Sequence, residues 1–366
     1  MKVECLKEKL AGAVYKAEKI TGKNLTLPVL SCILLEAKEN TLIIKATNLD
    51  LGIEITIPVR VLKEGKIAVS GALFNNFISH LHTDKNITLD VVDNNLSIIA
   101  PGHKTVINTM NYEDFPSIPK LEKEASTLLE AGSFVKGLKS VWYSAAISSM
   151  KPELSSVYVY THEDSLVFVA TDSFRLAEKR IKIKKTRNFE PILIPFKNVS
   201  EIIRIFEEVH DGVEFVVNKN QISLSYDGLY LTSRIIDGTF PDYKQIIPNQ
   251  FKTEVVMLKQ DLINALKIAN IFSDTFNQIN LKAQPEKKNF ELRTKNSNVG
   301  ENNNNVEAVI KGEGIDINFN YRYIIDCFQS IDADSVTLYF NGLHKPMVIR
   351  AIGDKSFTYL VMPMNK

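Results

Sequence analysis

Apolar residues recur at steps of three and four positions in three segments of the chain, and this period predicts amphipathic helices. The segments contain Leu6, Leu10, Val14 and Ala17, then Phe134, Leu138, Val141 and Ala145, then Leu258, Leu262, Leu266 and Ala269. A second helix is predicted later in each third of the chain, over Ala72 to Leu81, Phe196 to Phe206 and Tyr321 to Ile331. The helical pattern therefore occurs three times.

Short alternating apolar runs lie between these helices, and such alternation is typical of half-buried strands. Ile53 to Val59, Ile87 to Val91 and Leu96 to Ala100 are examples. Because the strands follow one another in runs, the pattern favours antiparallel sheets in an α+β fold over a parallel doubly wound sheet.

One strand in each third ends in a threonine followed by a polar residue. These threonines are Thr47, Thr171 and Thr294, spaced by 124 and 123 positions. Phe115-Pro116 and Phe240-Pro241 are 125 positions apart, and Met362-Pro363 follows 122 positions after Phe240-Pro241. A period near one third of 366 residues predicts three tandem copies of a helix-strands-helix-strands domain, over residues 1–122, 123–251 and 252–366.

The charge is balanced over the whole chain but not over the predicted helices. With 44 Lys and Arg against 43 Asp and Glu, the formal charge is +1, so no global field draws a polyanion to the surface. The predicted helices alone carry eleven cations and five carboxylates. Together with the threefold repeat, this surplus suggests helices that face one polyanion.

The common signatures of catalysis, cofactor binding and export are missing from the sequence. It has no phosphate-binding glycine loop, dinucleotide fingerprint, zinc-protease motif or nucleophile elbow. The pair His80 and His82 is more typical of a polar turn than of a metal site. Three widely spaced cysteines and a charged N-terminus without an apolar span of ~20 residues predict a soluble, reduced, cytoplasmic protein that does not bind a membrane. We expect no cofactor, no metal and no catalytic residue.

Two polar segments are more typical of a turn and a loop than of an active site. Asp172 and Arg175 could form a general acid–base pair, but a turn carboxylate and a loop arginine are the favoured interpretation. The run Asn302 to Asn305 is typical of an exposed loop.

Four segments, in order along the chain, resemble the bacterial DNA sliding clamps, the β subunits of DNA polymerase III. They are Leu25 to Leu35 (LTLPVLSCILL), Val169 to Ala177 (VATDSFRLA), Ile236 to Ile247 (IDGTFPDYKQII) and Leu360 to Asn365 (LVMPMN). The resemblance runs the full length of the chain. It implies the DNA clamp fold and a non-catalytic processivity factor, a homodimer whose six domains close a ring around duplex DNA of any sequence.

The resemblance also implies partners and site residues. The clamp loader, the catalytic subunit of DNA polymerase III and other clients would dock a short peptide with a leucine-phenylalanine end. The matching pocket positions are Thr171, Arg175, Leu176, Pro241, Asn320, Tyr323, Val361, Met362, Pro363 and Met364. Lys23 and Asn24 match a DNA-contacting loop, Lys136, Lys139 and Lys197 of the predicted helices are expected to face DNA, and Ile271 and Phe272 match a dimer interface position.

This chain departs from the family at two of these places. Ser173-Phe174 stands where relatives often have Gly-His or a tyrosine, and Asn24 stands where an arginine often contacts DNA. Two other functions remain as alternatives, an enzyme that acts on nucleotides through Asp172 and Arg175, and a repeat-built adaptor protein that does not bind DNA.

Overall fold

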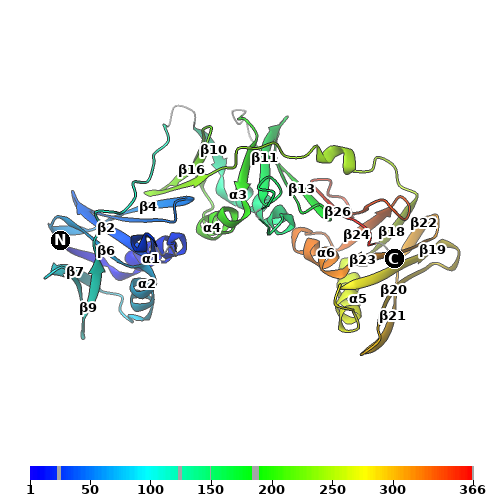
Figure 1. The fold of residues 1–366 in the computed structure, drawn as a ribbon, viewed down its shortest axis with the longest axis horizontal. Coiled ribbons are helices and arrows are strands. Elements are labelled where there is room, and N and C mark those ends of the chain that lie inside the picture. The colour runs from blue at the N-terminus through cyan, green and yellow to red at the C-terminus, as the bar shows by residue number, and fades with distance from the viewer. Residues whose placement is uncertain (23–25, 123–125, 149, 184–188, 365–366) are drawn as a thin grey trace. The chain divides into compact units, whose positions relative to one another are not determined.

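The computed structural model describes residues 1–22, 26–122, 126–148, 150–183 and 189–364. The chain divides into two compact units, Met1–Gly132 with Ser200–Ile235 and Ser133–Val199 with Ile236–Lys366. Figure 1 colours the chain from its N-terminus to its C-terminus, and its labels are used below.

The first unit is built on one thirteen-stranded sheet in which every pair of neighbours is antiparallel. In their spatial order the strands are β10 (Thr127–Glu130), β15 (Gly212–Val217), β16 (Gln221–Tyr226), β17 (Leu229–Arg234), β4 (Leu51–Pro58), β3 (Thr41–Thr47), β2 (Cys32–Lys38), β6 (Gly65–Ser70), β9 (His103–Met110), β8 (Asn95–Ala100), β7 (Asn86–Val92), β1 (Lys2–Leu6) and β5 (Arg60–Lys63). Helices α1 (Lys7–Ile20) and α2 (Gly71–His80) lie side by side against it (Figure 1).

The second unit contains a nine-stranded and a four-stranded sheet, again antiparallel. The larger has the order β14 (Ile192–Pro195), β11 (Ser156–His162), β12 (Ser165–Thr171), β13 (Arg175–Lys182), β26 (Phe357–Val361), β25 (Met347–Ala351), β24 (Ser335–Phe340), β18 (Thr253–Leu258) and β22 (Val309–Gly312). The smaller has the order β21 (Gly300–Val306), β20 (Asn289–Asn296), β19 (Gln278–Gln284) and β23 (Ile315–Asn320). Its helices are α5 (Lys259–Ile271) and α6 (Tyr321–Ile325). Helix α3 (Ala131–Val141) begins in the first unit and continues into this one, and α4 (Phe196–Phe206) begins in this unit and ends in the first.

The apolar period of the sequence places the helices correctly, except at their first turns. In α1 the side chains of Leu10, Ala13, Val14, Ala17 and Ile20 are buried, as a helical period requires. Leu6 and Leu258 were expected on the same faces but are 48% and 54% exposed. Each is the last residue of a strand, β1 or β18, so the strand sets the direction of its side chain.

Two strand pairs join segments that are far apart in the sequence. Within the first unit, β4 pairs with β17, with Leu51 opposite Ser233. Within the second, β13 pairs with β26, with Arg175 opposite Val361. We call these two pairs the internal seams. Each joins a strand of one predicted domain to a strand of the next, so the sheets continue from one predicted domain into another.

The turn before each seam strand repeats atom by atom. Thr47 Oγ1 donates to the carbonyl of Leu51 at 2.7 Å, and Thr171 Oγ1 donates to the carbonyl of Arg175 at 2.6 Å. Asn48 and Asp172 each accept backbone N–H groups two and three residues further on. The residues that follow, Leu49 and Ser173, both have φ of 77°. This agreement fixes the correspondence between the first two repeats.

The prediction that Thr294 corresponds to Thr47 and Thr171 is wrong. Thr294 Oγ1 donates to the carbonyl of Ala269 in α5, so its side chain faces the helix and not the turn. Asn296 corresponds to Asn48 and Asp172, since its Oδ1 accepts from the N–H of Asn298 two residues further on, and the residue that corresponds to the two threonines is therefore Lys295. Positions 48, 172 and 296 are spaced by 124 and 124, so the structural repeat is regular where the threonine pattern is one residue out of step.

Two further expectations are corrected by the structure. The run Asn302 to Asn305 is not a loop but the middle of β21, hydrogen-bonded to β20 over its whole length. Its polar side chains are used, since Asn304 donates to the carbonyl of Ala265 in α5. The helix predicted over Tyr321 to Ile331 is α6 only as far as Ile325 and continues as a 3₁₀ turn over Asp326–Ser330.

Candidate functional site

The turn from Thr171 to Arg175 ends at an arginine whose donors are held by this chain. Its Nε lies 2.9 Å from Asp172, Nη1 lies 2.5 Å from Asp326, and Nη2 donates to the carbonyl of Tyr143 at 2.6 Å. Its guanidinium also lies 4.8 Å from the centre of the Tyr323 ring. Only 11% of the side chain is exposed.

These contacts decide the chemistry that Arg175 can perform. Burial by itself would lower the pKa of the guanidinium, but Tyr359, Asp326 and Asp172 raise it above its ordinary value. A guanidinium that is always charged cannot exchange protons with a substrate. The geometry therefore gives Asp172 and Arg175 the arrangement of a capped turn and not of an acid–base pair.

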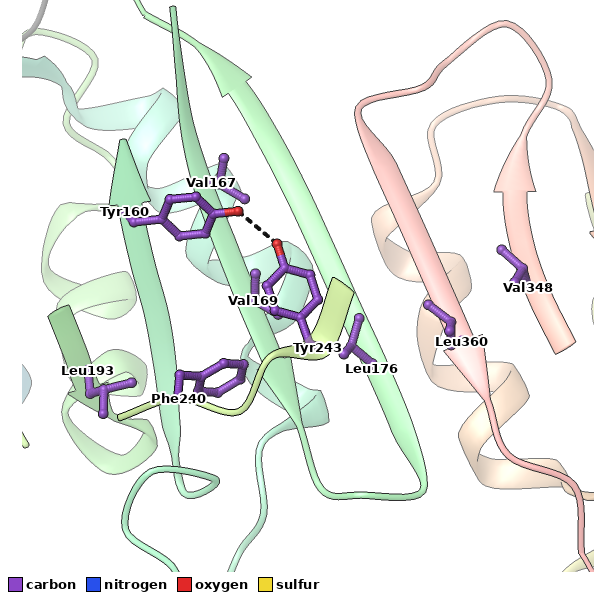
Figure 2. Close-up of a cluster of buried hydrophobic side chains, with 9 residues drawn as sticks. All are labelled: Tyr160, Val167, Val169, Leu176, Leu193, Phe240, Tyr243, Val348 and Leu360. Carbon is purple, nitrogen blue, oxygen red and sulfur yellow. Dashed lines mark hydrogen bonds between the residues drawn. The ribbon is translucent and has the colours of Figure 1, made fainter. Parts of the chain in front are cut away.

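Leu176, the next residue of β13, lies in an apolar cluster on one face of the sheet. Its register partner is Leu360 of β26, and both belong to a cluster with Tyr160, Val167 and Val169 (Figure 2). Phe240, Tyr243, Leu193 and Val348 complete its buried members. Leu176 is 3% exposed and Leu360 is 2% exposed, so their side chains do not form an open surface but lie beneath it, as the floor of this region.

Of the neighbouring β26 residues Leu360 and Val361, the sequence resemblance selected Val361, which points away from this cluster. Val361 pairs with Arg175, is fully buried and is not a member of the cluster. Leu360 is the member. The alternation of side chains along a strand is the signal that could have found it, because Leu176 and Leu360 are opposite each other and must share a face.

The chain segment after β17 crosses this cluster and carries Pro241. Phe240 stacks on Tyr158 with ring centres 4.8 Å apart, and Tyr243 is 3% exposed. Pro241, between these two aromatic residues, is exposed. Pro241 therefore stands at the surface beside side chains that are fixed in place.

The C-terminal segment is attached to the same region by its backbone. The N–H of Met362 donates to the carbonyl of Phe174 at 2.8 Å, and the N–H of Met364 donates to the carbonyl of Asn318 at 2.8 Å. Met362, Pro363 and Met364 are half-buried. Their apolar side chains keep some exposed surface, and Met362 lies next to the Thr171 turn.

Asn320 and Tyr323, expected at the rim, have distinct roles. Asn320 caps α6 by accepting from the N–H of Arg322, and it donates to the carbonyl of Phe276. Tyr323 stacks on Phe174 with ring centres 6.4 Å apart. Phe174 is 59% exposed, so the departure from the family at this position places an apolar ring on the surface.

The expected DNA-facing residues are described only in part. Lys23 and Asn24 lie outside the described residues. Lys136 is exposed on α3, and its ammonium group is paired with Asp332 at 2.8 Å. Lys197 is exposed and Lys139 is half-buried, and both make interactions with other groups of the chain. The structure thus places Lys136 and Lys197 at the surface of α3 and α4.

The expected interface residues lie at the end of α5. Ile271 is 65% exposed and Phe272 is half-buried. Phe276, which the sequence reasoning did not select, is 69% exposed five residues further on. The sequence signal that could have identified Phe276 is that this aromatic residue lies outside the helical apolar period. Of these side chains, Phe272 lies next to β21, since a Cβ on Gly300 would be 3.8 Å from its ring.

No other chemistry is visible in the described parts of the chain. Among those residues, no group of three or more His, Cys, Asp and Glu side chains could hold a metal ion. His80 is engaged with the carbonyl of Asn76 at 2.8 Å. None of the helices in these parts is long and apolar enough to cross a membrane.

Comparisons with protein families match the chain from end to end. Three domain models of the DNA polymerase III beta subunit match in order, the N-terminal domain over residues 1–119, the central domain over 129–242 and the C-terminal domain over 244–365. Together they cover more than half of the chain.

Relatives and solved structures agree with this match. The chain is 29% identical over 389 residues to the beta sliding clamp of Synechocystis sp. and 27% identical over 377 residues to that of Synechococcus elongatus, covering 100% of this chain and 99% of each relative. The sliding clamp structure from Bacillus subtilis has a TM-score of 0.94 at 22% identity, and it covers 100% of this chain and 99% of its own. The DNA polymerase III beta subunit structure from Thermotoga maritima has the same TM-score at 24% identity, with the same coverage. The fold is thus the three-domain clamp fold.

Proposed function

We propose that this chain, which belongs to the family of DNA polymerase III beta subunits, encircles duplex DNA as a homodimer and tethers a polymerase to it. The family is that of the sliding clamp, a processivity factor without catalytic activity. The observation that carries the proposal is the match of all three domain models, in order, along the chain. Domain boundaries at residues 1–122, 123–251 and 252–366, and a cytoplasmic location, are parts of the proposal.

Two open strand edges support a dimer. The internal seams use β4 with β17 and β13 with β26, so a third seam would need the corresponding strands β21 and β9. Within the described residues, β21 pairs only with β20, and the outer edge of β9 is paired only at Thr109 and Met110. A second copy could supply each missing neighbour, and two copies joined in this way close on themselves.

The internal seams also predict the register between the copies. Gly300 lies opposite Asn296 as Leu51 lies opposite Asn48, so Gly300 corresponds to Leu51 and Arg175. The second strand of each seam is aligned in the same way. Ile236, after β17, bridges Leu193, and Met110 of β9 pairs with Ala68, so Met110 corresponds to Ile236. Three residues earlier in each strand, Ile107 corresponds to Ser233.

This correspondence places Gly300 opposite Ile107 of the partner subunit. Glu301 then faces Val106 of the partner subunit, and Asn303 faces Lys104 of the partner subunit. Glu301, Val106, Asn303 and Lys104 are all exposed in the single chain. Lys104 is diagonal to Glu301 on the same face, and a pair of opposite charges there favours this register.

The size of duplex DNA also requires two copies. Helices pack about 10 Å apart, so six helices from one chain would close a circle about 19 Å across, with a bore of about 9 Å after one helix width of about 10 Å is subtracted. The major groove of DNA alone is about 12 Å wide. Twelve helices from two copies give a bore of about 28 Å, which leaves room for water around the duplex.

Contacts with the DNA in this ring would be electrostatic and individually weak. Phosphate contacts carry no sequence information, which suits movement along any sequence. Lys136 and Lys197 stand on different helices, so no single residue dominates. We expect Lys136→Ala to leave clamp function nearly unchanged and several such changes together to reduce the salt dependence of loading.

The proposal that the protein forms a ring around DNA can be tested by comparing its retention on circular and on linear DNA. Protein loaded on closed circular DNA should remain bound through gel filtration, and it should be lost once the same DNA is linearised. Ile271→Ala with Phe272→Ala should give a monomer that is not retained. Equal retention on both DNA shapes, or a wild-type monomer in sedimentation, would refute the proposal and favour an enzyme or an adaptor.

The same proposal assigns the client-peptide site to the surface around the Thr171 turn. Its members are Thr171, Arg175, Leu176, Pro241, Asn320, Tyr323, Val361, Met362, Pro363 and Met364, to which the buried cluster adds Leu360. Phe174, Pro241 and the half-buried methionines would contact the peptide, above the floor of Leu176 and Leu360. Methionine adapts to varied side chains, which suits a site that several clients share.

Truncation of the C-terminal segment tests this assignment. Removing Met362 to Lys366 takes away two backbone hydrogen bonds and the methionine surface. Binding of a synthetic peptide that ends in leucine-phenylalanine should be lost in calorimetry, while the dimer persists in sedimentation. Unchanged peptide affinity in the truncated protein would show that the site lies elsewhere.

A further inference from the structure

A buried carboxylate connects β13 to the linker that carries Pro241. Glu178 is 5% exposed and lies two residues after Leu176 on the same face of β13. One of its oxygens accepts from Arg180 Nε at 2.8 Å, and the other accepts from the hydroxyl of Tyr243. The Tyr243 hydroxyl is also 2.8 Å from that of Tyr160, as Figure 2 shows. A single side chain of the linker is thus held by two strands of the sheet.

Stability alone does not account for this arrangement. A carboxylate loses hydration when it is buried beside apolar side chains, and an apolar residue of similar volume is often at least as stable in such a place. What a buried hydrogen-bonded group adds is one defined geometry. The contact therefore fixes where the linker lies on the sheet.

The linker is held at two points on either side of Pro241. Before it, Phe240 stacks on Tyr158 with the two rings only 7° from parallel. After it, the phenol of Tyr243 binds Glu178. Burial and the hydrogen bond with Glu178 raise the pKa of Tyr243 well above its ordinary value, so the hydroxyl stays protonated and remains a donor.

We propose that Tyr243 and Glu178 are positioning residues for the client-peptide site, because their hydrogen bond holds Pro241 and the adjoining linker in the arrangement that a peptide binds. The inference rests on the proposed function of that site. Without the hydrogen bond, the linker would occupy the binding arrangement for only part of the time. The apparent dissociation constant would then rise by the inverse of that fraction.

Removal of single hydroxyl groups tests this role. Tyr243→Phe should weaken binding of the synthetic leucine-phenylalanine peptide by about 3- to 10-fold. This change corresponds to part of the free energy that a hydrogen bond to a charged group contributes. The loss should lie in the association rate, with the dissociation rate unchanged, since the bound state is the same. Stopped-flow mixing with a fluorescent peptide separates the two rates.

Two matched variants complete the test. Tyr160→Phe also removes one hydroxyl from this cluster but leaves the bond between Tyr243 and Glu178, so it should weaken peptide binding less than Tyr243→Phe does. Glu178→Gln keeps an acceptor for Tyr243 and should retain most of the affinity. In hydrogen exchange, the amides of Tyr243 and Ile247 should open faster in Tyr243→Phe, while β11 to β13 stay protected.

Three results would overturn the inference. They are unchanged peptide affinity in Tyr243→Phe, an equal loss in Tyr160→Phe, and a loss that comes with reduced protection throughout β11 to β13, which would make the role merely structural. A wild-type protein that binds no peptide would instead refute the proposed client site, so the two failures are distinguishable.

Discussion

Arg175 shows how one side chain can look like a ligand-binding group in the sequence and be occupied in the structure. Its position in TDSFRL suggested a residue of the peptide pocket, but Asp172, Asp326 and the carbonyl of Tyr143 occupy its donors. Asp326 is 151 positions away, a contact that no local pattern could predict. The turn residues Thr171 and Asp172, whose bonds are local, could be predicted from the sequence.

Arg175→Lys should therefore destabilise the protein although it keeps the charge. A lysine cannot reproduce the fork that reaches three acceptors, and it leaves half-buried partners unpaired. We expect the free energy of unfolding in urea to fall by about 2 to 4 kcal/mol. Arg204→Lys is the control, since its pair with Glu201 is 46% exposed at the arginine and should matter by less than about 0.5 kcal/mol. Equal effects of the two variants would contradict this account.

Glu36 links stability to pH through two lysines. Lys45 and Lys66 lie 3.0 and 2.9 Å from its two oxygens. Burial would raise the pKa of Glu36, but the hydrogen bonds from Lys66 and Lys45 outweigh it and lower the pKa below 4.5. The folded state then binds fewer protons than the unfolded state, so this stabilisation is complete above pH 4.5 and is lost as the pH falls through the folded pKa.

Glu36→Gln should remove that dependence. In urea unfolding at neutral pH the variant should be less stable than wild type. The difference in unfolding free energy between the two proteins should decrease as the measurement is repeated at successively lower pH values below 4.5. Glu39→Gln is the control, because Glu39 and its partner Lys38 are 77% and 59% exposed. A difference between wild type and Glu36→Gln that stays constant with pH would show that the pair does not titrate as described.

Among the secondary-structure elements, helix α3 depends on a glycine that the apolar period could not identify. A Cβ on Gly137 would lie 2.2 Å from the ring of Phe168 in β12, whereas a Cβ on Gly132 of the same helix would meet nothing within 4 Å. The helix approaches the strand closely because residue 137 has no side chain. The period predicted the helix, but this contact depends on a strand about 30 residues further on.

Substitution of the two glycines separates close packing from helix propensity. Gly137→Ala should lower the unfolding free energy by about 1 to 3 kcal/mol through overpacking. Gly132→Ala should be neutral or stabilising by up to about 1 kcal/mol, as expected for alanine in a helix. Thermal and urea unfolding of both variants measure this. A stabilised Gly137→Ala would mean that α3 can move away from Phe168 at little cost.

The strands also show which patterns the sequence can carry. The continuous apolar run Leu166 to Ala170 was recognisable, because its side chains pack against helix α3 on one face and against the apolar cluster on the other. β21 was missed because its asparagines carry no apolar alternation. Its identity as a strand depends on pairing with β20, which is a tertiary fact.

At the scale of the whole molecule, the proposed third seam can be tested by cross-linking. The register places Val106 of one copy opposite Glu301 of the other, and Cα atoms directly opposite in an antiparallel pair are about 4.5 to 5.5 Å apart. That distance suits a disulfide. The variant Val106→Cys with Glu301→Cys should form a covalent dimer under mild oxidation, seen on a non-reducing gel. The native cysteines, Cys5, Cys32 and Cys327, are buried and should not interfere.

An out-of-register variant is the control. Val106→Cys with Asn305→Cys displaces one partner by four residues, or about 13 Å along the strand, and should not cross-link. Strong cross-linking of this control, or none of the in-register pair, would contradict the register. The threefold period gave the sequence-based expectation of repeated domains, but the edges that remain unpaired became visible only with the strand pairing.

The internal seams also delay strand pairing during protein synthesis. The strand β13 pairs with β26, which begins about 180 residues later, and a ribosome adding about 5 to 20 residues per second needs roughly 10 to 35 s to reach it. During that interval the nascent chain presents an unpaired strand edge, which is a template for aggregation. Five of the eight residues of β13 are charged, namely Arg175, Glu178, Lys179, Arg180 and Lys182, and such charges discourage pairing with another chain. Lys182→Val should therefore increase the insoluble fraction during rapid translation, while the urea midpoint of the soluble protein stays close to that of wild type. An unchanged insoluble fraction would mean that the waiting edge is protected by something other than its charge.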